Sequence, residues 1–287
     1  MPFISCGQQM SSITISVITP VFNRELQVVD SIRSSLKLVT SGVVKEIVVV
    51  DDASTDNSYE RILNNFSNEI AGGVVKLYRL PKNQGVTGAK NFGASKASGD
   101  YLAFMDSDDV FLDGAGDKIL AELERNKINK LFFFRCIDLG TQKLIGREAE
   151  SNPLTIRDLI NNGTPGECLP VICRKTFELY PYDPRLRGCE SLSYYAMLSD
   201  CVAAMVSAHA VRGYCSAGLD RLSTKNGIRA RSVYLLIYNC KTLKFYRHMT
   251  LKRLAKAFFN IARYFYMAMS SGKISLRGSL SLIPTKT

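Results

Sequence analysis

The sequence predicts an α/β fold with a mainly parallel sheet, and three observations support this. Over the first hundred residues, short β-branched runs alternate with longer amphipathic stretches, which is typical of successive βα units. Polar segments such as Ser54-Thr55-Asp56 and Ser98-Gly99-Asp100 separate the runs, as they do at the ends of helices. The chain has 287 residues, 46% of them hydrophobic, so it is large enough to bury the core of such a sheet.

The predicted elements of the first half follow one another in a regular order. Strands are expected at Ile13–Thr19, Glu46–Asp51, Val74–Arg79 and Tyr101–Asp106, with helices between them at Leu26–Leu38, Asn57–Asn65 and Thr87–Ser98. In an open α/β sheet, ligands bind in the crevice beyond the carboxyl ends of the strands. We therefore expect Thr19–Asn23, Asp51–Asp56 and Asp106–Asp109 to converge there.

The pattern loosens after Asp109, and a second compact half begins near residue 112. It is expected to contain a helix near Gly116–Asn126 and an apolar strand at Lys130–Cys136. From residue 232 onward, apolar residues at spacings of three and four predict one or two basic amphipathic helices. The chain is thus divided into residues 1–112, residues 113–231 and a tail of residues 232–287. The apolar stripe of the tail consists of Leu251, Leu254, Phe258, Ile261, Phe265 and Met269.

The net charge of +11 is concentrated at the end of the chain. Between Arg221 and Thr287 there are 14 Lys or Arg and no Asp or Glu, so all 26 acidic residues precede this block. Phospholipid headgroups, nucleic acid or an anionic substrate would each match such a surface. Because the apolar residues follow a helical stripe, we favour contact with an anionic membrane surface over nucleic acid, with packing onto the body of the protein as the alternative.

The start of the chain and its cysteines indicate the compartment. Met1 to Ser12 lack the basic start and apolar core of a signal peptide, and nowhere do 18 uncharged apolar residues follow one another. The eight cysteines show no paired C-x-x-C spacing, which favours reduced thiols over a disulfide framework or a zinc site. We therefore expect a cytoplasmic protein that does not span a membrane.

A cluster of carboxylates follows the fourth predicted strand. On an extended segment, side chains two residues apart point to the same side, so Asp106 and Asp108 would face one ion together. Mg²⁺ and Mn²⁺ prefer oxygen ligands, commonly one or two carboxylates with substrate phosphates. The alternative is a solvated turn or a helix cap, in which Asp is common.

Two further segments accompany this cluster. The strand Val48-Val49-Val50 also ends in acids, from Asp51 to Asp56, and a carboxylate there can hydrogen-bond a base or a ribose hydroxyl. The glycine-punctuated segment from Asn83 to Gly93 carries Lys90, which suits a diphosphate. Taken singly, each segment is better explained structurally, with Asp56 as a helix cap and the glycines as packing sites.

Together and in this order, these segments resemble the family 2 glycosyltransferases, which have the GT-A fold. The matching stretches are Ser16 to Arg24, Ile47 to Asp56, Asn83 to Gly93 and Asp106 to Asp109, and the resemblance covers roughly residues 13 to 112. It implies a nucleotide-sugar-binding first half and a smaller acceptor-binding second half. It further implies that Pro20, Phe22 and Asn23 contact the sugar donor, that Asp52 binds the base, that Asp106 contacts ribose and metal, and that Asp108 binds the metal. Lys90 stands where the family usually has Arg, and the two are not interchangeable.

The second half carries the resemblance less fully. The segment from Arg187 to Tyr195 looks like the one in which this family has a Glu-Asp pair before a helix, and here the pair is Glu190-Ser191. The likeness implies Glu190 as the catalytic base, and the alternative is an acid favoured by the helix dipole. The segment Gly218 to Ser223 resembles a mobile region that closes over the sugar donor, in which Arg221 would neutralise the leaving phosphate or be a plain surface arginine.

The resemblance therefore implies an inverting glycosyltransferase that depends on Mn²⁺ or Mg²⁺. The sugar would move from a nucleoside diphosphate, such as a UDP-sugar, to a hydroxyl of a glycan or a polyprenyl-diphosphate-linked acceptor during the synthesis of O-antigen, capsule or another surface polysaccharide. That activity would be located at the inner face of the plasma membrane. Three alternatives remain: a non-catalytic sugar-nucleotide-binding module, a nucleotidyltransferase, and a nucleic-acid-binding protein that uses the basic tail.

Overall fold

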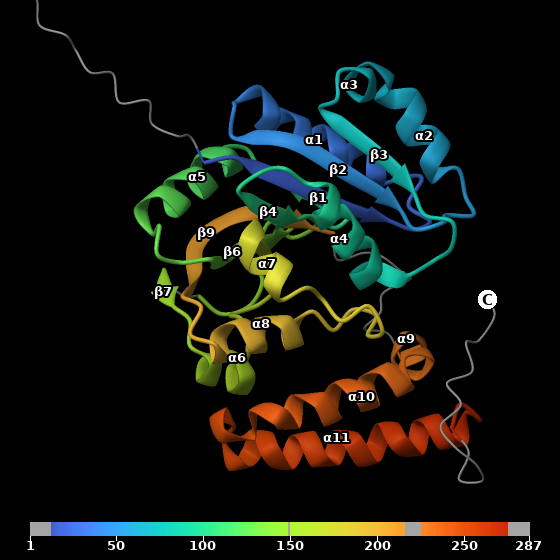
Figure 1. Ribbon diagram of the computed structural model, residues 1–287, viewed down its shortest axis with the longest axis vertical. Coiled ribbons are helices and arrows are strands. Elements are labelled where there is room, and N and C mark those ends of the chain that lie inside the picture. The colour runs from blue at the N-terminus through green and yellow to red at the C-terminus, as the bar shows by residue number, and fades with distance from the viewer. Residues whose placement is uncertain (1–12, 149, 216–224, 275–287) are drawn as a thin grey trace, which may run out of the picture.

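The strands predicted in the first half form a parallel sheet in the computed structural model, which describes residues 13–148, 150–215 and 225–274. β1 (Ile15–Val21) lies between β2 (Val44–Asp51) and β4 (Tyr101–Phe104), and β3 (Val75–Arg79) follows β2 at the edge (Figure 1). The four predicted strands and the three helices between them are confirmed, with every end within two residues. Val48, Val49 and Val50 are fully buried, as expected for a parallel strand covered on both faces.

The second half continues the same sheet with mixed strand directions. β8 (Cys168–Cys173) pairs antiparallel with β4, β6 (Leu131–Asp138) antiparallel with β8, and β9 (Ala204–Tyr214) parallel with β6. The short strands β5 (Val110–Phe111) and β7 (Asn152–Pro153) pair with β9. The predicted strand at Lys130–Cys136 is confirmed as β6 and the helix at Gly116–Asn126 as α5 (Ala115–Arg125). The two predicted halves therefore share one sheet.

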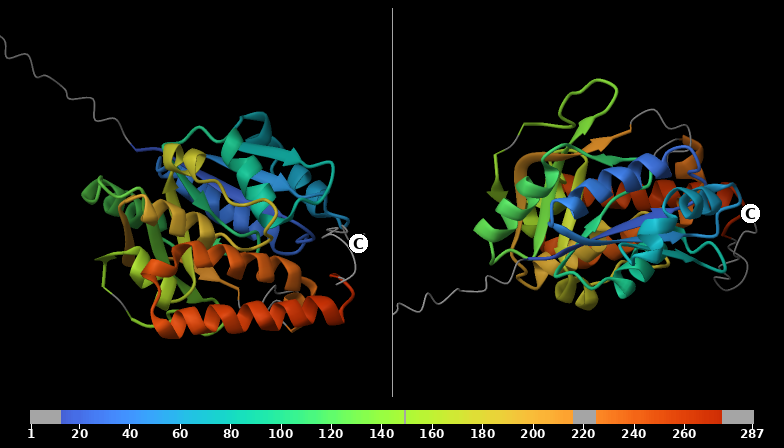
Figure 2. Two further views of the ribbon diagram at one scale, coloured as in Figure 1. Left: turned by 60° about the horizontal axis from the view of Figure 1, so that its bottom comes forward. Right: turned by 90° about the horizontal axis from the view of Figure 1, so that it is seen from above.

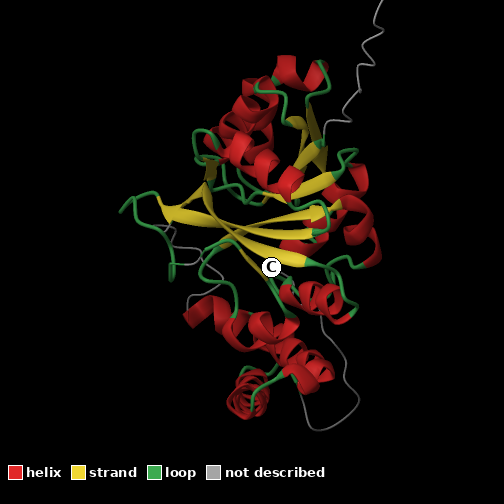
Figure 3. Ribbon diagram, turned by 90° about the vertical axis from the view of Figure 1, so that its left-hand side faces the viewer, coloured by secondary structure: helices red, strands yellow, loops and turns green. Residues whose placement is uncertain are grey.

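Helices cover both faces of this sheet and form two hydrophobic cores (Figures 2 and 3). α1 (Val28–Thr40), α2 (Ser58–Asn65), α3 (Ser67–Ala71) and α5 lie on one face, and α4 (Gly85–Lys96), α6 (Ile156–Asn162), α7 (Arg174–Leu179) and α8 (Ser191–Ser199) on the other. Successive residues of β1 alternate between them, with Val17 in the first core and Ile18 in the second. A Cβ at Gly93 would lie 2.5 Å from the Ile18 side chain, so glycine lets α4 approach β1 closely.

The tail forms a layer of helices at one side of the molecule. It contains α9 (Lys225–Ala230), α10 (Ser232–Thr242), the 3₁₀ helix η1 (Leu243–His248) and α11 (Leu251–Ser270), which confirms the predicted helices from residue 232 onward. α10 lies between α8 and α11, so α11 is the outermost element (Figure 1). Within the part of the chain described by the structure, each helix is too short or too polar to cross a bilayer.

Candidate active site

The carboxyl ends of β1, β2 and β4 meet at one edge of the sheet, as the sequence predicts. The amide of Asp52 donates to the carbonyl of Val21 at 2.7 Å, and the amide of Met105 donates to that of Ile18 at 3.0 Å. These two bonds pair β1 with the residues that directly follow β2 and β4. The polar segments that follow the strands are therefore held beside one another, and a ligand at this edge would contact all three.

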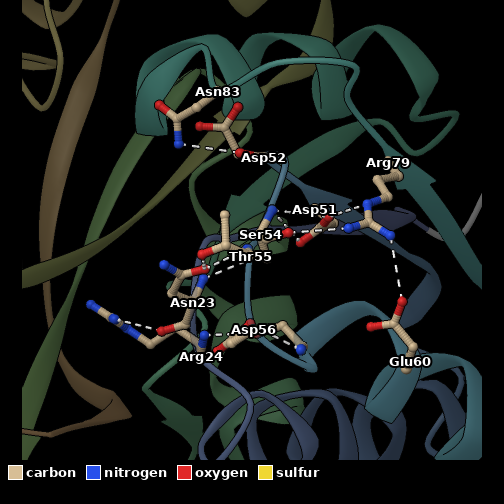
Figure 4. A network of polar contacts seen from close by, with 11 residues as sticks. Asn23, Arg24, Asp51, Asp52, Ser54, Thr55, Asp56, Glu60, Arg79 and Asn83 are labelled. Atoms are coloured by element: carbon tan, nitrogen blue, oxygen red, sulfur yellow. Dashed lines mark hydrogen bonds and ion pairs between the residues drawn. The ribbon is translucent and has the colours of Figure 1, made fainter. Parts of the chain in front are cut away.

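The acids after β2 are held mainly by backbone amides and by Arg79 (Figure 4). Both carboxylate oxygens of Asp51 accept a bond from the amide of Ser54 at 3.3 Å. Asp52 accepts from the amides of Gln84 and Gly85 at 2.6 and 2.7 Å, at the start of α4. Burial raises the pKa of Asp52, and these two amides oppose the rise. Asp52 thus satisfies the amino end of α4, and its contact with a base stays a prediction.

The other residues predicted to contact the sugar donor in the first half lie around the end of β1. Pro20 is buried inside the strand, paired with Val50, whereas Phe22 is 43% exposed just beyond it. Asn23 has a φ of 52°, which Asn tolerates, and its side-chain oxygen accepts from the amide of Thr55 at 2.9 Å. Of these residues, Phe22 offers an exposed aromatic face on which a base can stack.

Three predicted residues from distant parts of the chain meet at one point. The ammonium group of Lys90 lies 3.1 Å from an oxygen of Asp106 and 3.2 Å from an oxygen of Glu190. Burial alone would lower the pKa of Lys90, but Asp106 and Glu190 raise it above its ordinary value. Lys90 comes from α4, Asp106 follows β4 and Glu190 precedes α8, so the site joins both halves of the chain.

Arg212 also belongs to this site, and the sequence reasoning missed it. It projects from β9, is 2% exposed, and places its guanidinium 3.5 Å from Asp106 and 3.4 Å from Asp109. It also donates to the sulfur of Cys136 at 3.1 Å. Although burial opposes the effect, Lys90 and Arg212 hold the pKa of Asp106 below its usual range. The available signal was a charged residue inside an apolar strand, which is costly unless paired.

The remaining acids of the cluster occupy a turn, so the expectation of an extended segment through Asp108 is wrong. β4 ends at Phe104, and the amide of Asp109 donates back to the carbonyl of Asp106 at 3.2 Å. Burial and the nearby Asp106 raise the pKa of Asp108, which is paired with Arg24 at 3.7 Å. Burial raises the pKa of Asp109 to about 7 against the opposing charge of Arg212. Asp106 to Asp109 thus place three carboxylates in one turn beside three basic side chains.

This donor set fits a divalent metal that is completed by substrate. Among the described residues, no three His, Cys, Asp or Glu side chains are grouped as a ready-made cage. Mg²⁺ and Mn²⁺ are commonly bound by one or two carboxylates together with substrate phosphates. Asp106 and Asp108 can supply the carboxylates. Burial first, and the charge of Asp106 second, raise the pKa of Asp108, and a bound cation would stabilise its ionised form.

A pocket of about 510 Å³ opens at this cluster. Lys90, Asp106, Glu190 and Arg212 form its polar wall. The lining also includes residues of α8 and of the tail helix α10, among them Tyr238, whose hydroxyl lies 2.9 Å from that of Ser191. The tail therefore completes the pocket, which its sequence pattern did not reveal. Arg221, the remaining predicted contact, lies outside the described residues.

Glu190 occupies the position before the first residue of α8 without capping it. Its side chain makes no cap hydrogen bond, and the carboxylate points instead to Lys90, with 22% of the side chain exposed. The carboxylate therefore has a partner besides the helix terminus, and its role as a base or as an acid favoured by the helix dipole stays a prediction. A carboxylate in a pocket, partly accessible and oriented by a buried cation, is placed to accept a proton.

Comparisons with known proteins agree with this geometry. The sequence model described as "Glycosyl transferase family 2" matches residues 16–168. A Haemophilus influenzae uncharacterized glycosyltransferase is 41% identical over 109 residues, which cover 38% of this chain and 40% of the relative. The Escherichia coli WfgD, named UDP-Glc:alpha-D-GlcNAc-diphosphoundecaprenol beta-1,3-glucosyltransferase, is 28% identical over 58% of this chain and 62% of its own. The chain thus spans less than two thirds of the length of these relatives.

A solved structure extends the likeness to nearly the whole fold. S. aureus TarS 1–349 in complex with UDP-GlcNAc matches with a TM-score of 0.63 over 93% of this chain and 77% of that one, at 17% identity. At this identity the match shows the fold alone, and that fold is the GT-A fold of glycosyltransferases. The chain belongs to glycosyl transferase family 2.

Proposed function

We propose that the protein moves a sugar from a nucleoside diphosphate, in the first instance UDP, to a hydroxyl of a glycan or a lipid-linked oligosaccharide, with inversion at the anomeric carbon. The observation that carries the proposal is the junction of Lys90, Asp106 and Glu190 in one pocket. The acid-bearing strand end and the acid before α8 come from different halves, so a sugar donor and an acceptor bound there would meet. The name of WfgD supports a diphosphoundecaprenol-linked acceptor, and the UDP-GlcNAc complex of TarS supports a UDP-sugar donor. A surface polysaccharide would be the product.

Glu190 would accept the proton of the acceptor hydroxyl while the oxygen of that hydroxyl attacks the anomeric carbon. In a single displacement, the base lies on the acceptor side and positive charge is needed on the side of the departing diphosphate. Lys90 is placed to serve that side, since it is buried and already faces two carboxylates. Together with Lys90, Arg212 would favour the ionised form of Asp106 against the effect of burial. These residues would hold both substrates in line while the proton moves to Glu190.

Asp106 and Asp108 would hold Mn²⁺ or Mg²⁺. A bound divalent ion would supply positive charge to the diphosphate leaving group. A metal ion could replace the present partner of Asp108, because that partner is the partly exposed Arg24 at 3.7 Å. Such a long ion pair at the surface is weak and would yield to a stronger cation.

The acceptor would be carried by a membrane, with the enzyme in the cytoplasm at the inner face of the plasma membrane. The acceptor named for WfgD carries a diphosphoundecaprenol group, which supports this assignment. The basic tail is consistent with it, because all of its charged residues are cationic.

Ser191 keeps one other function open, a sugar-nucleotide-binding module without transfer. It stands where the resembling family has its second acid, and its hydroxyl contacts Tyr238 instead of a catalytic group. The two functions differ in the behaviour of Glu190→Gln. If Glu190 is the base, this variant binds the sugar donor normally and loses transfer by about 10² to 10⁴-fold.

The test is thermal stabilisation of the purified protein by UDP, GDP, CDP and ADP, each with Mn²⁺, with Mg²⁺ and with chelator. A ligand that binds only the folded state raises its stability by mass action. We expect a shift for one base, dependent on metal, that Glu190→Gln retains while transfer assayed with the matching sugar donors is lost. No shift for any base would contradict the proposal, and a shift without transfer by the wild type would support the binding module.

A further inference from the structure

The outermost helix, α11, carries a row of large apolar side chains on its solvent side. The row recurs at intervals of seven and eight residues, which places its members on one face of the helix. It is defined as Leu251, Phe258, Phe259, Phe265 and Tyr266, which are 86%, 55%, 67%, 41% and 72% exposed. We call these five side chains the aromatic row, after its four aromatic members. Exposed apolar patches of this kind mark contact surfaces on proteins.

The aromatic row does not help to hold α11 on the protein. The opposite face of α11 packs against α10, and its buried members are Ala257 and Ala268, with Leu254 and Ile261 partly buried. The apolar stripe expected from the sequence is therefore divided. Leu254, Ile261 and Met269 are partly buried, whereas Leu251, Phe258 and Phe265 stay exposed. α10 is enclosed on both sides, with only Cys240 exposed among its 11 residues. The outer face of α11 thus remains available for another surface.

Basic side chains flank the aromatic row. Lys252, Lys256 and Arg263 are exposed and, at 100° per residue, lie along the flank next to Phe259 and Tyr266. The chain has no acidic residue between Arg221 and its end. The surface therefore combines apolar rings with charge of a single sign, which defines the chemistry of its partner.

We propose that the outer face of α11 docks on an anionic lipid bilayer, with the aromatic row in the interface and the basic flank at the headgroups. A helix of this composition lies in the plane of the interface, gaining from buried apolar area and from attraction to anionic lipids. Two copies of the face would bring Lys252, Lys256 and Arg263 against like charges with no acid on either helix. Nucleic acid would match the charge but leave the rings uncovered.

Hydrogen bonds and helix packing connect the outer face of α11 to the catalytic pocket. Asn161 of α6 accepts a bond from the amide of Thr250 at 2.7 Å, and Arg253 donates to the carbonyl of Ile160 at 2.8 Å. These bonds fix the start of α11 to the body, while α10 beneath it lines the pocket with Tyr238. Docking would then hold the catalytic pocket at a fixed height beside the bilayer. This inference deepens the proposed function and rests on its membrane-borne acceptor.

The experiment is vesicle flotation of the full-length protein with neutral phosphatidylcholine vesicles and with vesicles that contain a quarter phosphatidylglycerol. We expect binding to the anionic vesicles only, reduced at least tenfold by Phe259→Ser with Tyr266→Ser. The matched control is Ile128→Ser with Leu179→Ser, which removes two equally exposed apolar side chains, 78% and 76%, from other surfaces. Lys252→Gln with Lys256→Gln should weaken binding at low salt, and Lys118→Gln with Lys127→Gln should not.

Absence of binding by the wild type, or equal binding by the aromatic variant and its control, would overturn the proposal. A concentration-dependent dimer that only the aromatic variant abolishes would assign the face to a second copy instead. Nucleoside diphosphate binding in the same samples separates this inference from the proposed function. The aromatic variant should keep the metal-dependent thermal shift but no longer bind anionic vesicles. Glu190→Gln should keep both the thermal shift and vesicle binding.

Discussion

Acids lie at the carboxyl ends of both β2 and β4, and the two groups of carboxylates differ in most of their partners. Beyond β2, Asp52 accepts bonds from the backbone amides of Gln84 and Gly85, and Asp51 accepts from the amide of Ser54 and also pairs with Arg79 at 3.2 Å. Beyond β4, the partners are side-chain cations: Lys90 and Arg212 face Asp106, and Arg24 faces Asp108. Both groups follow an apolar strand in the sequence, and only the structure distinguishes them.

The difference indicates which acids shape the fold and which can exchange partners. An amide has a fixed position in the backbone, so a carboxylate bonded to it holds one loop against another. A side-chain cation can turn away, and a carboxylate that it balances can then take up a metal ion or a substrate group. On this comparison, changes at the β2 end should act on stability and changes at the β4 end on turnover.

The largest effect is expected at the β4 end. Asp108→Ala should lower turnover at least a hundredfold, because it removes a carboxylate that we propose holds the metal ion at the leaving diphosphate. The melting temperature should stay close to that of the wild type, since the side chain is 34% exposed and its ion pair with Arg24 spans 3.7 Å. Initial rates and thermal melts of the same preparation measure both quantities.

Asp113→Ala is the control for this variant, because its carboxylate lies five residues further on and is 94% exposed. That control should leave both turnover and melting temperature unchanged. Near-normal transfer by Asp108→Ala would break the comparison at its functional side. A collapse of stability without a specific loss of turnover would place Asp108 with the acids of β2.

The intermediate effect is expected at the β2 end. Asp52→Ala leaves the amides of Gln84 and Gly85 without their acceptor in a region where Asp52 is 2% exposed. Leaving such donors unsatisfied should lower the free energy of unfolding by about 2 kcal/mol. Urea denaturation without ligands measures it, again beside Asp113→Ala. If the unfolding free energy is unchanged while nucleotide binding disappears, the carboxylate serves a ligand and not the fold.

The sequence predicted what is local and missed what is distant. Every element end up to Lys96 was within two residues, because strand runs, turns and helix periodicity are written in consecutive residues. Asp106 and Glu190 were also found as candidates, from their place in local segments. The contact of Lys90 with Glu190 joins residues 100 apart, and that of Arg212 with Asp106 joins residues 106 apart. No periodicity encodes such pairs, since they depend on how β8, β6 and β9 are inserted beside β4.

The role of the tail shows the same limit. Its helices were predictable from a stripe of apolar residues, but which part of the stripe faces inward was not. The inner face is set by the close packing of Ala257 and Ala268 against α10, small residues that carry little weight in a hydrophobic pattern. The contact of Tyr238 with Ser191 likewise depends on where α10 lies over α8.

The smallest effect is expected at Glu46, a buried acid near the beginning of β2. Its carboxylate accepts from the Ser98 amide at 2.6 Å and from the Ser16 hydroxyl at 2.7 Å, and it pairs with Lys76. Burial alone would raise its pKa, but these partners lower it to about 2. By its bond to a backbone amide, Glu46 belongs with the acids that hold the fold.

The pH dependence of stability follows from this shift. The folded pKa is lower than the unfolded one, so the stabilisation is fully present above pH 4.5 and is lost as the pH falls toward about 2. Glu46→Gln should therefore be less stable than the wild type by about 1–2 kcal/mol at pH 7. The gap should close as the pH falls below 4.5, whereas the exposed Glu124→Gln should follow the wild type throughout. Urea denaturation at pH 7, 5, 4 and 3 would show this, and a gap independent of pH would mean that packing, not the ionised carboxylate, provides the stability.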